Sequence, residues 1–203
     1  MTQVPQPGPE NLSLEQAELW RFIVEGPRAK SLRQPVTALP GPFGPWLQIP
    51  SVGRCAAEMG EILRFRSILS GDLREIAILT VGVHWKAEFE FWAHSAMARS
   101  EGVDETILQA LQTGQDPPFK TPQQQLVHSA AVQLLTKGHL PPTLRDRMAE
   151  ELGWPATVEL VALIGYYCMV SFTLNAFDVG LPEGVAHYWR REQTAPLPAP
   201  TTS

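Results

Sequence analysis

The sequence lacks the features by which many protein classes are recognised. Only two cysteines occur among 203 residues, and Cys55 and Cys168 lie far apart, so there is no disulfide framework and no Cys-x-x-Cys redox or zinc motif. We expect both cysteines to be buried core thiols. The sequence also has no Gly-rich phosphate loop and no nucleophile elbow. It therefore predicts no organic cofactor and no serine or cysteine triad.

An excess of positive charge is also missing. The chain has 16 basic and 21 acidic residues, a formal charge of -5, so it lacks the basic surface that binds nucleic acid or anionic membranes. Its first residues lack the basic and apolar segments of a secretory signal, and we expect a cytoplasmic protein. The apolar segment 159–177 is shorter than the ~20 residues that cross a bilayer. We predict that it is a core or subunit-interface helix and not a membrane span.

Alternating strand patterns with hairpin turns are absent as well, and this absence favours an all-α fold. Ser13 and Gln16 have the spacing of a capping box, so a first helix is expected from there to Gly26. The Pro- and Gly-rich segment 31–54 is predicted to be a loop that walls a pocket. Further helices are expected over residues 55–69, 72–100, 104–113, 121–138, 143–152 and 156–179.

The two ends of the chain differ in composition from the middle. Residues 1–10 and 186–203 are rich in proline and small polar residues, which is typical of tails and linkers. The segment 11–185 between them is long enough for one domain with a core of its own. We predict a single helical domain over 11–185 with a flexible tail at each end.

The segment VHWKAEFEFWAH, residues 83–94, places several titratable groups in an otherwise apolar part of the chain. Glu90 and His94 are four residues apart and share a helix face, and Glu75 would lie about 60° away on a straight helix. Burial in an apolar wall shifts the pKa of such groups toward neutrality, which suits general acid and base catalysis. His84 joins them only if the chain kinks near Gly82 or if it faces another subunit. A plain i, i+4 pair is the structural alternative.

Metal binding is disfavoured. Either Glu90 with His94 or His84 with Glu88 supplies two ligands from one helix face, but no second paired motif follows. We therefore expect no metal ion.

The segment LREIAILTVGVHWKAEFEFWAHSAMARSEGVDETILQALQTG resembles the core of the carboxymuconolactone decarboxylase family, which includes the alkylhydroperoxidase-D-like proteins. The resemblance covers most of residues 40–182, and by it Glu75 matches the family's helix glutamate and His94 its histidine. It implies an alkylhydroperoxidase-D-like helical bundle that assembles into a homotrimer or homohexamer. The peroxidase branch has Cys-x-x-Cys where this chain has residues 87–90, so thiol peroxidase activity is not expected.

The activity that this resemblance implies is cofactor-independent decarboxylation of a small carboxylated lactone or enolisable acid. We assign His94 as the proton donor paired with Glu90, and Glu75 as a buried acid that orients the site or shares the proton. The further candidates are His84 as oxyanion donor or second acid, Arg74 as carboxylate anchor, and Trp46, Trp85 and Glu88 as substrate-binding residues. Two alternatives stay open. One is an isomerase, cyclase or lactone hydrolase with the same pocket, and the other is a helical ligand-binding oligomer without catalysis.

Overall fold

A computed structural model describes residues 4–31 and 36–189, and within these ranges the regular structure is entirely helical. The all-α prediction is confirmed. The α-helices are α1 Leu14–Glu25, α2 Phe43–Trp46, α3 Pro50–Phe65, α4 Gly71–His84, α5 Glu88–Ser100, α6 Glu105–Thr113, α7 Pro122–Lys137, α8 Pro142–Leu152 and α9 Trp154–Ala176. Two short 3-10 helices, Pro9–Asn11 and Pro27–Ser31, flank α1.

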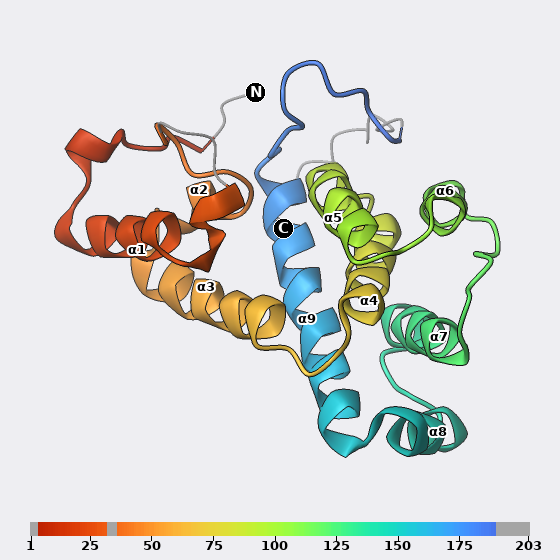
Figure 1. Cartoon of the computed structure of the whole chain (residues 1–203). Coiled ribbons are helices and arrows are strands. Elements are labelled where there is room, and N and C mark those ends of the chain that lie inside the picture. Colours follow the sequence, from red (N-terminus) through yellow and green to blue (C-terminus); the bar gives the residue numbers. More distant parts are fainter. Residues whose placement is uncertain (1–3, 32–35, 190–203) are drawn as a thin grey trace, which may run out of the picture.

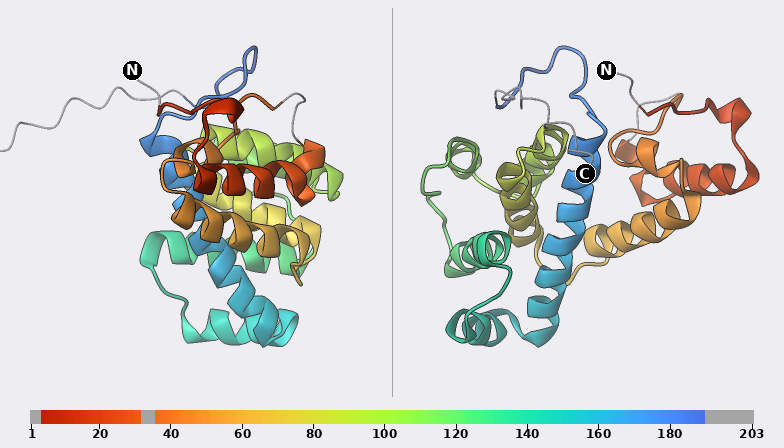
Figure 2. Two further views of the ribbon diagram at one scale, coloured as in Figure 1. Left: turned by 90° about the vertical axis from the view of Figure 1, so that its left-hand side faces the viewer. Right: turned by 180° about the vertical axis from the view of Figure 1, so that it is seen from behind.

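Helix α9 forms the axis of the molecule (Figure 1). Helices α1 to α3 lie on one flank of α9 and α4 to α7 on the other, and the views from the side and from behind show the same division (Figure 2). Helix α9 contacts α3, α4, α5, α7 and α8. Its central place explains the apolar composition that the sequence shows on nearly every side of this helix.

The buried side chains form three clusters. The largest joins α3, α4, α7 and α9, and includes Ile78, Val127 and Leu160. A second cluster lies between α4, α5 and α6, and a third is confined to α1, α3 and the segment between them. Helix α4 contributes to the first two clusters, so it is buried on opposite sides. A polar residue on this helix is therefore held in a largely apolar environment.

Helix starts with a clear capping signal lie where the sequence predicts them. Ser13 accepts a hydrogen bond from the Gln16 amide, and the Gln16 side chain accepts one from the Ser13 amide, which completes the capping box. Thr121 caps α7 by accepting a hydrogen bond from the Gln124 amide, with Pro122 at the first helical position. Gly114 and Gly138 end α6 and α7 with a left-handed backbone. These four boundaries confirm the predictions.

The helical stretch expected over residues 72–100 is divided in two, because α4 ends at His84 and α5 begins at Glu88. Amides of Lys86 and Ala87 bond the carbonyls of Val83 and Gly82, the pattern of a Schellman motif. Lys86 takes the left-handed position with φ 50°, where glycine is the usual residue. The chain therefore turns back, and α5 lies beside α4 (Figure 1).

The loop predicted for residues 31–54 is partly wrong. Its proline residues do not prevent helices: Pro50 occupies the first turn of α3, where a proline costs no hydrogen bond, and α2 forms over Phe43–Trp46. Residues 32–35 of the predicted loop lie outside the described part. Cys55 on α3 is exposed, so its assignment to the core is wrong, whereas Cys168 on α9 is half-buried.

Helix α9 is the one helix of the described residues that is long and apolar enough to cross a membrane, and half of that stretch is buried inside the fold. Its exposed apolar residues are Trp154, Val158, Val161, Met169 and Phe172. At 100° per residue these five fall within an arc of about 80°. Helix α9 is therefore buried on most of its circumference and presents one apolar stripe, which we call the α9 stripe.

Candidate active site

Glu75, Glu90 and His94 meet between α4 and α5. The Nδ1 atom of His94 lies 2.6 Å from Oε2 of Glu75, and its Nε2 atom lies 3.0 Å from Oε1 of Glu90. The first contact is a hydrogen bond, whereas the second lacks the alignment of one, which leaves Oε1 of Glu90 without a hydrogen-bond partner among the described residues. The imidazole is thus held firmly on one side and loosely on the other.

Burial makes these contacts strong. Glu75, Glu90 and His94 are 1%, 3% and 5% exposed. Burial alone would lower the pKa of His94, but the charges of Glu75 and Glu90 and their contacts raise it to about 9. Burial alone would raise the pKa of Glu75, yet the charge and hydrogen bond of His94, together with Arg74, hold it below its ordinary value. At neutral pH the histidine is therefore a cation beside the Glu75 carboxylate.

Arg74 extends this network toward the surface. Its Nε atom lies 3.4 Å from Oε1 of Glu75, and its Nη2 atom lies 3.2 Å from Glu101. Two carboxylates therefore already hold the guanidinium that the sequence analysis assigned to the substrate carboxylate. In this structure Arg74 neutralises and orients Glu75.

Aromatic rings close the site on the side of α9. The ring of Tyr167 stands edge-on to the His94 imidazole, with 5.1 Å between centroids, and Tyr166 stands edge-on to Tyr167 at 5.2 Å. Burial raises the pKa of the Tyr166 hydroxyl to about 12 and that of Tyr167 well above its ordinary value, and Glu90 acts in the same direction on both. Both tyrosines are therefore neutral hydrogen-bond donors at physiological pH.

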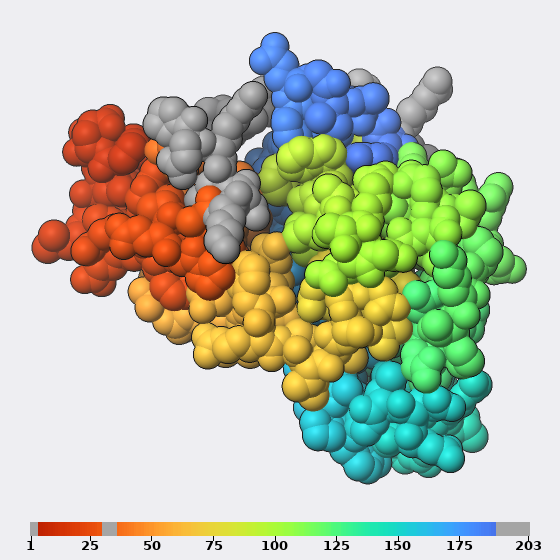
Figure 3. All heavy atoms as spheres, in the orientation of Figure 1, coloured from red at the N-terminus to blue at the C-terminus, as the bar shows by residue number. Residues whose placement is uncertain are grey.

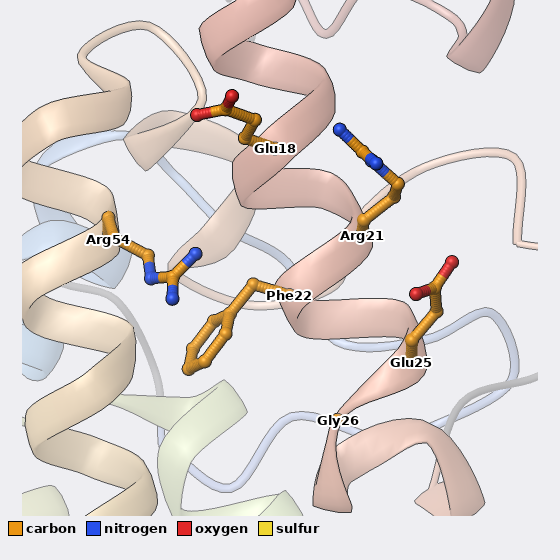
Figure 4. Close-up of a pocket in the computed structure, with 6 residues that line it drawn as sticks. All are labelled: Glu18, Arg21, Phe22, Glu25, Gly26 and Arg54. Atoms are coloured by element: carbon orange, nitrogen blue, oxygen red, sulfur yellow. The ribbon is translucent and has the colours of Figure 1, made fainter.

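Two hollows of the described surface lie away from the buried triad. One of about 440 Å³ lies between α1 and α3 and is lined by exposed charged side chains such as Arg21 and Arg54 (Figure 4). Another, of about 240 Å³, is bounded by the 39–45 segment, Phe89 and residues 177–182. Over α4 and α5 the visible atoms form a continuous surface in Figure 3. The triad is thus enclosed within one copy of the chain.

His84 does not join the triad in this structure. It is exposed at the end of α4, and its ring stands edge-on to Trp85 with 4.7 Å between centroids. The Trp85 indole donates to Cys168 Sγ at 3.4 Å and stacks edge-on with Phe172 of the α9 stripe. His84 and Trp85 therefore lie at the edge of the exposed apolar surface.

Trp46 and Glu88 have contacts of their own. Trp46 is buried, and its indole donates to the Thr173 hydroxyl at 3.3 Å, which fixes α2 to α9. Glu88 accepts hydrogen bonds from the amides of Tyr188 and Trp189 and contacts His187 at 2.7 Å. The start of the segment predicted as a C-terminal tail is thus attached to α5, and its residues from 190 onward lie outside the described part.

Sequence reasoning missed several polar groups near the triad. Arg28 is buried, and Arg64 on α3 places Nη2 at 2.8 Å from Sδ of Met97, one turn beyond His94 on α5. Tyr166 and Tyr167 were treated only as part of an apolar helix. Their spacing in the sequence does not indicate that the two arginines and the two tyrosines lie near Glu90, because these residues come from three separate segments. Among the described residues, no three His, Cys, Asp or Glu side chains are arranged to hold a metal ion.

Comparisons with models of known protein families and with curated protein sequences found no match. The likeness to the carboxymuconolactone decarboxylase family therefore rests on the residues quoted above. Family membership stays a prediction.

Proposed function

We propose that the protein is a cofactor-independent carboxy-lyase of the carboxymuconolactone decarboxylase type, with His94 as general acid. The observation that carries the proposal is a histidine between two buried carboxylates, with its pKa raised to about 9. Such a group keeps its proton at neutral pH in a site that excludes water. Perturbed titratable groups of this kind are frequent at active sites.

The triad has the parts that decarboxylation needs. When the bond to carbon dioxide breaks, its electron pair moves into a conjugated carbonyl and leaves an enolate, which must receive a proton on carbon. We assign that transfer to Nε2 of His94, because its contact with Glu90 is poorly aligned whereas Nδ1 is bonded to Glu75. Glu75 then fixes the imidazole and stabilises its charge, and Arg74 holds Glu75 in place.

Self-association is the second part of the proposal. The α9 stripe exposes a row of apolar side chains that includes Trp154, Val158 and Phe172, and soluble proteins seldom leave such a surface uncovered. We propose that a copy of the same chain covers it and brings His84 and Trp85 to a subunit contact. Sedimentation analysis of wild type and Val158→Glu tests this. Dissociation of the variant supports the proposal, and a monomeric wild type contradicts it.

The experiment is proton NMR in deuterated buffer with γ-carboxymuconolactone and a small panel of carboxylated lactones and β-keto acids. Loss of carbon dioxide with deuterium on the adjacent carbon is the expected result. Turnover by His94→Ala and Glu75→Gln should fall ~10²–10⁴-fold, the usual contribution of one acid or base. For wild type, kcat/KM should decline above pH 9 as His94 loses its proton.

His187→Ala is the matched control, because His187 also contacts a glutamate at 2.7 Å but is largely exposed. It should keep full activity. If His94→Ala does not fold, Glu90→Gln is the variant to use in its place, because it removes a charge from the site and preserves its shape. Survival of every substrate beside folded wild-type protein would exclude the lactone decarboxylase.

Two other functions remain candidates. An isomerase, cyclase or lactone hydrolase would use the same His94 and Glu75, and product analysis separates it because only the carboxy-lyase releases carbon dioxide. A ligand-binding oligomer without catalysis is favoured by the enclosure of the triad, whose members are 5% exposed or less. In that case the variants change stability or ligand affinity, and there is no turnover to lose.

A further inference from the structure

A second polar cluster lies beside the triad, on the side of α1 and α3. Arg28 follows α1 and is only 5% exposed, and among the described residues its Nε atom has no hydrogen-bond partner. A buried guanidinium usually has a carboxylate partner, because removing its charge from water is costly. Here burial lowers the pKa of Arg28, and the nearby charge of Arg64 lowers it further. The structure therefore places two cations close together in a poorly hydrated position.

The surroundings of Arg28 do not neutralise it. Its guanidinium lies 5.3 Å from the centroid of Phe43 and 5.7 Å from that of Phe65, and Arg64 lies 5.0 Å from the latter. Glu61 is the nearby carboxylate, but it contacts Arg66 at 3.3 Å. Within the described residues, neither Arg28 nor Arg64 has a carboxylate at ion-pairing distance. The cluster thus has two guanidinium groups without a direct carboxylate partner, although the charge of Glu61 acts on Arg28 and that of Arg64 acts on Glu75.

A neutral donor completes the cluster. The hydroxyl of Tyr166 and Nη2 of Arg28 converge above Gly60, where a side-chain Cβ would collide with both. Burial keeps this hydroxyl protonated, with its pKa raised to about 12. Gly60 is therefore the residue that lets a phenol and a guanidinium come together over α3.

The cluster is continuous with the triad. Tyr166 stacks on Tyr167, which stacks on His94, and Arg64 reaches Met97 one turn from His94 on the same helix. The charges of Arg28 and Glu90 both act on Tyr166. Arg64 is only partly buried, so its side chain connects the cluster to the surface of the molecule.

We propose that Arg28, Arg64 and the Tyr166 hydroxyl form a carboxylate-binding subsite next to His94. Guanidinium groups bind carboxylates through paired, charge-assisted hydrogen bonds, and the phenol supplies a further donor. This subsite extends the proposed function. It rests on that function in one respect only, which is that the bound carboxylate is the carboxylate of the substrate. The substrate anchor is then this arginine pair, and Arg74 is a positioning residue for Glu75.

The test is a binding titration of the full-length protein with benzoate, followed by NMR and calorimetry, with benzamide as the uncharged probe of the same shape. Wild type should bind benzoate about tenfold or more tightly than benzamide, and Arg28→Gln and Arg64→Gln should each remove about that factor. Arg54→Gln is the matched control, because Arg54 lies on α3, as Arg64 does, but already bonds Glu58 at 2.6 Å. It should bind benzoate as wild type does.

Gly60→Ala gives an independent check, since it displaces Tyr166 and Arg28 without changing charge and should also weaken benzoate binding. Equal affinity for benzoate and benzamide, or an unchanged affinity in folded Arg28→Gln, overturns the subsite. Failure of the two proposals is distinguishable. Benzoate binding that depends on Arg28 without carbon dioxide release leaves the subsite and removes the carboxy-lyase. Turnover with an unchanged KM in Arg28→Gln leaves the carboxy-lyase and removes the subsite.

Discussion

Two glutamate–histidine pairs in this molecule have almost the same length and different surroundings. Glu75 and His94 lie 2.6 Å apart, and Glu88 and His187 lie 2.7 Å apart. The side chain of His94 is 6% exposed, whereas that of His187 is 73% exposed. Water screens the second pair, and the first has a further carboxylate, Glu90, on its other nitrogen. Distance alone therefore does not decide what such a pair contributes.

The largest expected difference is in stability. His94→Ala removes the buried cation between Glu75 and Glu90, and breaking a buried pair in this way costs ~3–5 kcal/mol. His187→Ala should cost less than ~1 kcal/mol, as for other exposed ion pairs. Urea unfolding of both variants at neutral pH measures the two values. Equal losses of stability in the two variants would show that burial does not make the Glu75–His94 pair more stabilising than the Glu88–His187 pair.

The next effect is a pH dependence. The pKa of His94 is raised from 6.5 to about 9, so its stabilisation is fully present below pH 6.5 and disappears as the pH rises through 9. The shift corresponds to a loss of about 3 kcal/mol in the free energy of unfolding. Unfolding of wild type at neutral and alkaline pH should show it. His94→Gln is the control for alkaline effects that come from elsewhere in the chain, and the same loss in that variant would exclude His94 as the cause.

A smaller change is expected from the second carboxylate. Glu90→Gln should lower the pKa of His94 from about 9 but leave it above 6.5, since Glu75 is its stronger partner. NMR titration of the imidazole follows this shift directly. Glu88→Gln is the control with the same chemical change on the same helix, and it should leave the titration of His94 unaltered.

The smallest effect is local. Opposing the cost of burial, hydrogen bonds from His187 and from the amides of Trp189 and Tyr188 hold the pKa of Glu88 below its ordinary value. Glu88→Gln keeps an oxygen for the amides but loses the charge, so global stability should change by ~1 kcal/mol or less. Hydrogen exchange at Tyr188 and Trp189 should nevertheless become faster. Unchanged exchange would show that the other contacts of the segment hold it, namely the rings packed on Phe91 and the hydrogen bond from the Trp189 indole to the Gln112 carbonyl.

The sequence predicts helix boundaries well where a side chain marks them. Ser13 with Gln16 and Thr121 with Pro122 act through local hydrogen bonds and backbone limits, which depend on neighbouring residues alone. The end of α4 has no such mark, because lysine occupies the left-handed position at residue 86. A helical pattern on both sides of this turn therefore resembles one uninterrupted helix.

The candidate site was predicted in part for a reason that the structure corrects. Glu75 and His94 do meet, but they do so across two adjacent helices and not along a straight one. Arg28 and Tyr166 lie far apart in the chain, and only tertiary packing shows that they converge over Gly60. Their roles stay predictions until the variants are measured.

The three residues between α4 and α5 determine which face of α5 is turned toward α4 in the active site. Trp85, Lys86 and Ala87 fix the angle at which α5 presents Glu90 and His94 to Glu75. Removal of one of them would turn α5 by ~100° about its axis and leave both helical sequences unchanged. A length change at this connection, with no substitution of a charged residue, would thus separate Glu75 from the imidazole of His94.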